Sequence, residues 1–260
     1  MSFVIGLDIG AVFVKGVLLT EDGRTICWRE KSGKNYSETA ERVRARLLEV
    51  AGESTGDCSG VAVTGCGAGC LVSPAQKVNE MVCLARAVSE TAGSCAVLDL
   101  GGQSCRTAAL DEKGRLSAVS FSEKCASGSG NVLEKAANVL HVPFEELATL
   151  SEGADTPVEF TVSCAVFMES EIITAIANGK RPQDIAAGVH RAVAQKIYAM
   201  LSKAHQESLP VVASGGAAAD AGVIRALEGL LGRGVTVMNA PQFTIARGAA
   251  LSVLDQIGSA

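Results

Sequence analysis

The sequence predicts an α/β protein of two lobes, each built from the same β-β-β-α-β-α-type unit. Two observations support this fold class. Hydrophobic residues make up 48% of the 260 positions, aromatic residues only 4%, and there are 28 glycines, as is typical of α/β proteins with many strand-to-helix turns. The chain also repeats itself, because "VIGLDIG" with "FVKGVLL" in the first half corresponds to "AVLDLGG" with "CRTAALD" in the second. Each copy is an apolar strand ending in Asp-x-Gly, a tight turn and a second strand, which predicts a duplicated fold around a cleft.

The first lobe is predicted over residues 1–94, completed by a C-terminal helix at 243–260. Patterns of alternating residues, with the turn "EDGR", predict strands at 3–9, 12–20 and 24–30. A helix at 37–51, a strand at 60–65 and a helix at 75–92 are expected to follow.

The second lobe is predicted over residues 95–242. It opens with a buried strand at 95–102, followed by strands in "SCRTAAL" and "LSAVSF" on either side of the turn "DEKGR". Most of the remaining chain has helical patterns. We expect helices at 129–140, 144–151, 164–178, 183–204 and 217–231, and strands at 210–214 and 235–238. A final helix at 242–255 is expected to pack back on the N-terminal lobe.

Charge and cysteine content exclude several classes of function. The net charge of −5, with no basic cluster, argues against a nucleic-acid or anionic-membrane partner. The apolar N-terminal run carries Asp8, Lys15 and several glycines, so we expect neither a signal peptide nor a membrane span. Without an export signal, the nine cysteines are expected to stay reduced in the cytoplasm. Five of them are expected to be buried small hydrophobic residues: Cys27, Cys58, Cys83, Cys95 and Cys105.

The two Asp-x-Gly turns form the first candidate site. Such a turn leaves backbone N–H groups without ladder partners, and these groups can hold phosphate oxygens while the aspartate positions a hydrated Mg²⁺. Asp8 and Gly10 fit this role in the first half, with Lys15 as a cation that neutralises phosphate charge. The matching residues in the second half are Asp99, Gly101 and Gly102. Two ordinary hairpins would give the same local pattern.

A third glycine turn follows the strand "VVAS", where Gly215 and Gly216 precede a helix. Paired glycines at this point let a flat base or sugar approach the backbone closely. The three turns together resemble the phosphate 1, phosphate 2 and adenosine motifs of the actin-like ATPase superfamily. That resemblance implies the two-lobed fold shared by acetate and sugar kinases, heat-shock ATPases and actin, and it implies binding of ATP or ADP with Mg²⁺.

Two cysteines stand before predicted helices, Cys125 in "EKCASGSG" and Cys164 in "VSCAVFMESEI". The positive end of a helix lowers the pKa of a nearby thiol and favours the thiolate. None of the three histidines lies in a recognisable catalytic setting, so we do not expect a nucleophilic cysteine. The two thiols either pack in the core or form half of a four-thiolate site that a two-fold related subunit completes.

The segments "EKCASGSG", "SCAVFMESEI" and "DIAAGVHRAVA", after a "DLGGQ" turn, closely resemble the BadF/BadG/BcrA/BcrD ATPase family. The resemblance implies that Cys125 and Cys164 of two subunits bridge one 4Fe–4S cluster per dimer, and that ATP drives a low-potential electron to a partner. Asp99 and Gln103 are the expected catalytic residues, with Gln103 positioning the attacking water. The implied partners are a second copy or a related subunit, a CoA-ester dehydratase or reductase as electron acceptor, and an upstream ferredoxin or flavodoxin.

The chain departs from the family pattern at the phosphate turns. Small hydroxyl residues usually follow the first Asp-x-Gly, but here the positions hold Ala11, Val12 and Phe13. After the second turn, Ser104 and Arg106 stand where the activators have an Asp and a Lys. These changes predict weakened phosphate binding and slow or absent ATP hydrolysis.

Three other interpretations remain open. A small-molecule kinase of the same superfamily would need a catalytic carboxylate, for which Glu169 and Glu171 are the candidates. A nucleotide-sensing subunit with a degenerate ATPase site would explain the missing hydroxyls. In "TGCGAGC", Cys66 and Cys70 form a candidate second pair of soft metal ligands, with Cys83 as a possible third.

Overall fold

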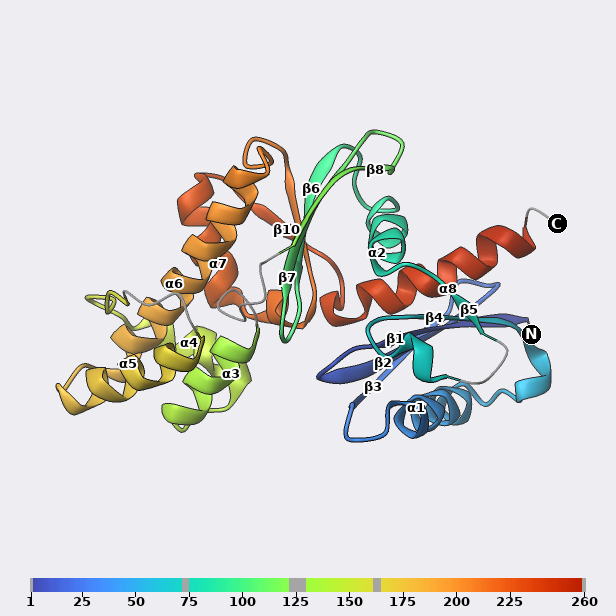
Figure 1. Cartoon of the computed structure of the whole chain (residues 1–260), viewed down its shortest axis with the longest axis horizontal. Helices are drawn as coiled ribbons and strands as arrows, with labels where there is room; N and C mark the ends of the chain where they lie inside the picture. The colour runs from blue at the N-terminus through green and yellow to red at the C-terminus, as the bar shows by residue number, and fades with distance from the viewer. Residues whose placement is uncertain (1, 72–74, 122–129, 161–164, 259–260) are drawn as a thin grey trace. The chain divides into compact units, whose positions relative to one another are not determined.

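The computed structural model describes residues 2–71, 75–121, 130–160 and 165–258. The chain folds into two compact units, of which unit 1 comprises 1–93, 111–116 and 242–260, and unit 2 comprises 94–110 and 117–241. Each unit contains a five-stranded mixed sheet and its own helices (Figure 1). Each sheet contributes to a separate buried apolar core.

The sheet of unit 1 has the strand order β3-β2-β1-β4-β5. Its strands are β1 Phe3–Ile9, β2 Phe13–Thr20, β3 Thr25–Lys31, β4 Cys58–Thr64 and β5 Gln76–Lys77. The first three strands pair antiparallel in a meander, whereas β4 pairs parallel with β1 and β5 pairs parallel with β4. All seven residues of β1 are buried, as expected for a central strand that is covered on both faces.

Helices cover both faces of this sheet (Figure 1). Helix α1 (Tyr36–Ala51) packs on β2 and β3, and α8 (Thr244–Ile257) packs on β1 and β4 beside α2 (Glu80–Val88). The core between the sheet and α1 contains the alternate residues of β1 from Phe3 to Ile9. The C-terminal helix is therefore part of the packing of unit 1.

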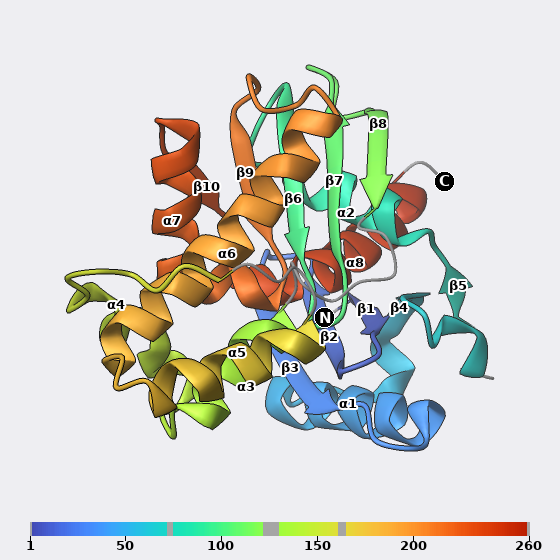
Figure 2. The same ribbon diagram turned by 60° about the vertical axis from the view of Figure 1, so that its left-hand side comes forward.

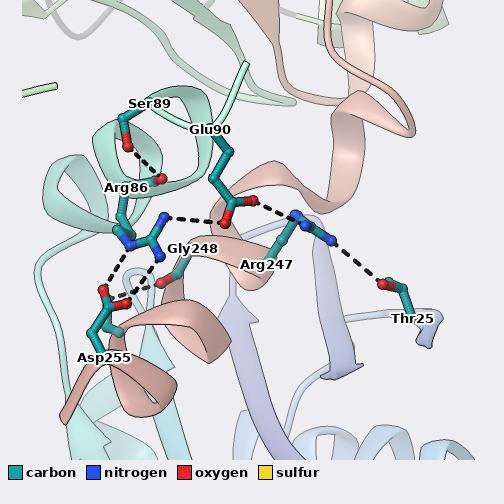
Figure 3. A network of polar contacts seen from close by, with 8 residues as sticks. Thr25, Arg86, Ser89, Glu90, Arg247, Gly248 and Asp255 are labelled. Atoms are coloured by element: carbon teal, nitrogen blue, oxygen red, sulfur yellow. Dashed lines mark hydrogen bonds and ion pairs between the residues drawn. The ribbon is translucent and has the colours of Figure 1, made fainter. Parts of the chain in front are cut away.

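Polar side chains link α8 to α2 and to β3 (Figure 3). Arg86 on α2 donates to Asp255 on α8 with an Nε–Oδ2 distance of 2.6 Å, and its Nη1 lies 3.2 Å from Glu90 Oε1. Glu90 also accepts from Arg247 Nη2 at 2.9 Å, and Arg247 donates to the Thr25 hydroxyl. Each of these exposed ion pairs contributes little on its own, and together they link α8 to α2 and to the start of β3.

The sheet of unit 2 has the strand order β10-β9-β6-β7-β8. Its strands are β6 Cys95–Leu100, β7 Cys105–Leu110, β8 Leu116–Phe121, β9 Val211–Ser214 and β10 Val235–Val237. The first strand again pairs antiparallel with the second and parallel with the fourth, which pairs parallel with the fifth. The two sheets therefore share one strand order and the same directions in these three pairs, and the predicted duplication is confirmed.

The helices of unit 2 are α3 Gly130–Val139, α4 Leu147–Glu152, α5 Ala165–Ala177, α6 Pro182–Lys203 and α7 Ala221–Leu231. Helix α6 is central, because it packs against α7, α4, α3 and β7 (Figure 2). A single buried apolar core joins these helices to the strands. In each unit, the Asp-x-Gly turn thus follows a strand that is anchored in a packed core.

Three predicted helices begin later in the structure than expected. The helix expected at 144–151 begins at Leu147, after a 3₁₀ turn at Phe144–Glu146. The helix expected at 75–92 spans only Glu80–Val88, because the Asn79 side chain caps it by accepting from the N–H of Met81 at 2.9 Å, and the preceding Gln76–Lys77 pairs with β4. The helix expected at 217–231 begins at Ala221. A 3₁₀ turn precedes it, and Asp220 is its N-cap.

The structure also bears on the predicted absence of a membrane span and on the predicted burial of five cysteines. Of the helices that the structure describes, none has the length and apolarity needed to span a bilayer. Cys83, Cys95 and Cys105 are buried as expected, but Cys27 and Cys58 are only half-buried. Burial raises the pKa of the Cys83 thiol to about 12 and also raises the pKa of Cys105, so both are neutral thiols at physiological pH.

Candidate nucleotide site

The first phosphate-type turn is built around a buried ion pair. Asp8 is the next-to-last residue of β1 and stands opposite Lys15 of β2, whose Nζ donates to Asp8 Oδ2 at 2.7 Å. Asp8 is 2% exposed, and its second oxygen, Oδ1, has no hydrogen-bond partner within the described residues. The turn is closed by the N–H of Gly10, which donates to Phe13 O at 3.1 Å.

The second turn repeats this construction in unit 2. Asp99, 3% exposed, stands opposite Arg106, and the Asp99 Oδ2–Arg106 Nη1 distance is 3.6 Å. The N–H of Gly101 donates to Ser104 O at 2.9 Å, as Gly10 does to Phe13. A Cβ on Gly101 would lie 2.8 Å from that same carbonyl oxygen, so the turn has no room for a side chain. Gln103 is exposed within this turn, where its amide is available to a water or a phosphate.

Three supporting contacts come from residues far away in the sequence. The Ser32 hydroxyl donates to Gly10 O at 2.6 Å, and the N–H of Gly67 donates to Ile9 O at 2.9 Å. In the second half, the Ser214 hydroxyl lies 3.4 Å from Asp99 Oδ1 and donates to it. Sequence reasoning missed these residues, because a single serine or glycine many positions from the motif carries no local signal.

The third turn lies against the second one. Gly215 has a φ of 88°, in the region that favours glycine, and its N–H donates to Pro241 O at 2.9 Å. A Cβ on Gly215 would lie 2.3 Å from Leu100 O, the last residue of β6. The close approach places Gly215, followed by Gly216, next to the strand that carries Asp99. The structure therefore brings together two of the three predicted turns within unit 2.

The second turn is also joined to helix α3. The N–H groups of Gly130 and Asn131 donate to the carbonyl oxygens of Gly101 and Gly102, both at 2.9 Å. These are N–H groups of the first helical turn, which have no partner inside the helix. The glycine turn thus caps α3, and a displacement of the turn must displace the start of the helix or break both hydrogen bonds.

The two candidate cluster ligands, Cys125 and Cys164, lie outside the described residues. Helix α3 begins five positions after Cys125, and α5 begins at the residue after Cys164. These two helices pack together, and Lys135 Nζ on α3 lies 2.8 Å from Glu169 Oε2 on α5. The carboxylate of Glu169, a candidate catalytic base of the kinase interpretation, is therefore engaged in an ion pair.

One side chain of the first turn offers a donor for a metal ion. Asp8 offers one buried carboxylate oxygen without a hydrogen-bond partner in the described structure, beside a phosphate-type turn, and this donor fits a hydrated Mg²⁺. Within the described ranges, no group of three or more His, Cys, Asp and Glu side chains could hold a metal ion. The described structure therefore does not group Cys83 with Cys66 and Cys70 as three metal ligands.

The amino-acid sequence is similar to those of several known proteins. The sequence model of the BadF/BadG/BcrA/BcrD ATPase family matches residues 5–253. The activator of lactoyl-CoA dehydratase from Anaerotignum propionicum is 34% identical over 251 residues, which cover 96% of each chain. A subunit of benzoyl-CoA reductase from Thauera aromatica is 30% identical over 88% of this chain and 83% of its own.

A solved structure shows the same similarity in three dimensions. The activator of 2-hydroxyisocaproyl-CoA dehydratase from Clostridium difficile, with bound ADPNP, has a TM-score of 0.91 and 31% identity, and the match covers 99% of this chain and 96% of that one. The predicted actin-like fold class is thereby confirmed, together with the family resemblance. This chain belongs to the BadF/BadG/BcrA/BcrD ATPase family.

Proposed function

We propose that this protein is an ATP-dependent activator that delivers a low-potential electron to a CoA-ester dehydratase or reductase. The similar proteins named above are an activator of a 2-hydroxyacyl-CoA dehydratase and a subunit of benzoyl-CoA reductase. One observation carries the proposal: the carbonyl groups of the second glycine turn accept hydrogen bonds from the first residues of α3. A nucleotide-type turn is thereby attached to the helix that follows Cys125.

The proposed nucleotide-binding residues have distinct roles. Asp8 positions a hydrated Mg²⁺ through Oδ1 while Lys15 holds Oδ2 and adds positive charge for the phosphates. Gln103 orients the attacking water, and Asp99 supports it from the end of β6. The remaining proposed contacts to Mg-ATP are backbone contacts of Gly10, Gly101, Gly102, Gly215 and Gly216. Loss of hydroxyls at 11–13 leaves the first turn with backbone donors, which supports a slow hydrolysis rate.

The proposed redox centre uses Cys125 and Cys164 of two copies, or of this chain and a related subunit, as four thiolate ligands. When bound, a 4Fe–4S cluster supplies a one-electron carrier of low potential. The Lys135–Glu169 pair holds α3 against α5, which supports a fixed geometry for the two helices that follow these cysteines. A reduced ferredoxin or flavodoxin in the cytoplasm is the proposed electron source.

The coupling is tested without any partner enzyme. Protein purified without oxygen is reduced, freed of reductant and mixed with an oxidised low-potential viologen in the presence of Mg-ATP, Mg-ADP or neither. The proposal predicts that the viologen is reduced with Mg-ATP and that ADP does not replace ATP. Gln103→Ala is expected to lower ATP turnover and viologen reduction together, because both depend on the oriented water. Gln76→Ala, at an exposed position on β5, is the matched control.

Equal viologen reduction with ATP, with ADP and without nucleotide would contradict the coupling. Iron-free protein that transfers phosphate from ATP to a hydroxyl compound would instead establish the kinase interpretation. Iron-free protein that binds ATP without turnover would establish the nucleotide-sensing interpretation.

A further inference from the structure

Helix α6 carries the segment "DIAAGVHRAVA" (184–194), which matches the family but has no place in the nucleotide site described above. Polar and small residues of its first three turns, including Asp184, Gly188 and His190, are buried. Burial of a carboxylate and an imidazole costs free energy unless each has a partner. Their partners therefore indicate what α6 holds in place.

The first two turns of α6 hold residues 155–160, the segment that leads to Cys164. Asp184 Oδ1 accepts from the N–H groups of Asp155 at 2.9 Å and Thr156 at 2.8 Å, and the Asp184 carbonyl accepts from Val158 N–H at 2.9 Å. At Gly188 the segment touches the helix itself, because a Cβ there would lie 2.2 Å from Val158 O. The missing side chain at Gly188 thus allows the backbone of the segment to contact the helix directly at Val158.

The third turn of α6 holds the start of α7, the helix after the Gly215–Gly216 turn. His190 is 2% exposed, and its Nε2 lies 3.2 Å from Asp220 Oδ1. The same oxygen caps α7 by accepting from Gly222 N–H at 2.8 Å and Val223 N–H at 3.1 Å. The imidazole also lies against Gly222, where a Cβ would be 2.2 Å from His190 Cε1.

We propose that His190 is a positioning residue that couples the Gly215–Gly216 turn to residues 155–160 through α6. Gly188 and His190 are two positions apart on one rigid helix, and both contacts are close-packed. A shift at the start of α7 therefore moves His190, and α6 carries the movement to Val158 and the segment before Cys164, since packed interiors transmit strain. The inference rests on the proposed binding of nucleotide at the Gly215–Gly216 turn.

The test is hydrogen exchange of the full-length protein, followed by mass spectrometry, with and without Mg-AMPPNP. In the native protein, AMPPNP is expected to slow exchange of the 155–158 amides by about threefold or more, along with amides at 215–223. His190→Phe keeps an aromatic ring but removes the donor to Asp220, so the response at 155–158 is expected to disappear while that at 215–223 remains.

His190→Gln should restore the response at 155–158, because its side-chain amide can donate where Nε2 does; a purely structural role would not give this rescue. Gly229→Ala on α7, where a Cβ meets nothing within 4 Å, is the control and should respond like the native protein. A native protein that responds at 215–223 but not at 155–158 would overturn the coupling, as would an unchanged response in His190→Phe. Absence of AMPPNP binding, measured separately by calorimetry, would overturn the proposed nucleotide function and this inference with it.

Discussion

At the scale of single residues, one buried carboxylate organises each of the two Asp-x-Gly turns. Asp8 and Asp99 occupy equivalent positions at the ends of β1 and β6, and each stands opposite a basic residue of the next strand, Lys15 or Arg106. Removing one member of a buried ion pair leaves an uncompensated charge and is strongly destabilising. The basic residues therefore have a structural role that exists before any phosphate binds.

Asp8→Asn is predicted to weaken binding of Mg-ATP by about tenfold or more, since a hydrogen bond to a charged group contributes roughly 1.5–3 kcal/mol and 1.4 kcal/mol is a factor of ten. The affinity for ATP in EDTA should be unchanged or higher, because the substitution removes a negative charge near the phosphates. Calorimetric titration in both conditions measures the difference. Asp111→Asn, in the exposed turn before β8, is the control. Equal weakening with and without Mg²⁺ would show that Asp8 does not position the metal.

The charged carboxylate of Asp184 stabilises the folded protein, so we expect stability to fall when this group is protonated in acid. The Arg181 guanidinium, followed by the N–H of Thr156, lowers the pKa of Asp184 to about 2, below the ordinary value near 3.9. A lowered folded-state pKa stabilises the protein above the unfolded-state pKa, and this contribution is lost as the pH falls from about 4 to about 2. Asp184→Asn should therefore lower the urea midpoint at pH 7.

The gap between the two urea midpoints should close as the pH approaches about 2, the folded-state pKa of Asp184. Asp155→Asn removes the exposed partner of the same Arg181, so it should have little effect at any pH. A difference between the native protein and Asp184→Asn that stays constant down to about pH 2 would contradict this account of the lowered pKa.

The residues of the Asp-x-Gly turns can be identified from the sequence alone. The residues that support these turns cannot. Asp8, Gly10, Asp99 and Gly101 are recognisable because the strand, the turn and its closing hydrogen bond are local. Support from Ser32 and Ser214 depends on tertiary packing, which no local pattern encodes. Asp99 stands opposite Arg106 because of the strand register of the β6–β7 hairpin. The sequence predicts the two strands but not their register.

At the scale of elements, most strand and helix identities followed from periodicity, but three helix starts did not, and two of these are set by side-chain caps. Asn79 and Asp220 both cap helices from inside segments with continuous helical patterns. An Asn or Asp side chain satisfies the first N–H groups of a helix as a cap and competes with the backbone inside one. At both sites the helix therefore begins at the cap and not where the apolar periodicity begins. Before Asn79, the residues outside the helix join the sheet as β5.

Because α8 and α2 are in close contact, adding one methyl group at Gly248 is expected to lower the stability of the protein. A Cβ on Gly248 of α8 would lie 1.7 Å from the backbone oxygen of Cys83 on α2, so Gly248→Ala must separate the two helices. We expect a loss of about 2 kcal/mol or more in the free energy of unfolding, despite the better helix propensity of alanine. Urea unfolding followed by circular dichroism measures it.

Gly229→Ala provides the matched comparison, because Gly229 is also helical but has open space around its Cβ position. This variant should be as stable as the native protein or more stable, by up to about 1 kcal/mol. Equal effects of the two substitutions would show that the packing of α8 on α2, with its surrounding network (Figure 3), does not limit stability.

At the scale of the whole molecule, the duplicated sheet order explains why one chain carries two equivalent Asp-x-Gly turns. The connection between β8 and β9 carries α3 to α6, whereas the equivalent connection of unit 1, between β3 and β4, carries α1. The connection in unit 2 contains Cys125 and Cys164 in sequence, and it is joined to the second turn through α3 and to the third through α6. The proposed electron-transfer role therefore resides in the connection in which the two units differ.

We propose that two chains share one 4Fe–4S cluster through these cysteines. The most direct test is the iron and acid-labile sulfide content per chain of protein purified without oxygen, together with its mass in solution. We expect about two iron atoms and two sulfides per chain in a dimer, retained in Cys58→Ser and lost in Cys125→Ser and Cys164→Ser. Iron-free protein that cannot be reconstituted, or iron retained after both cysteines are replaced, would contradict it.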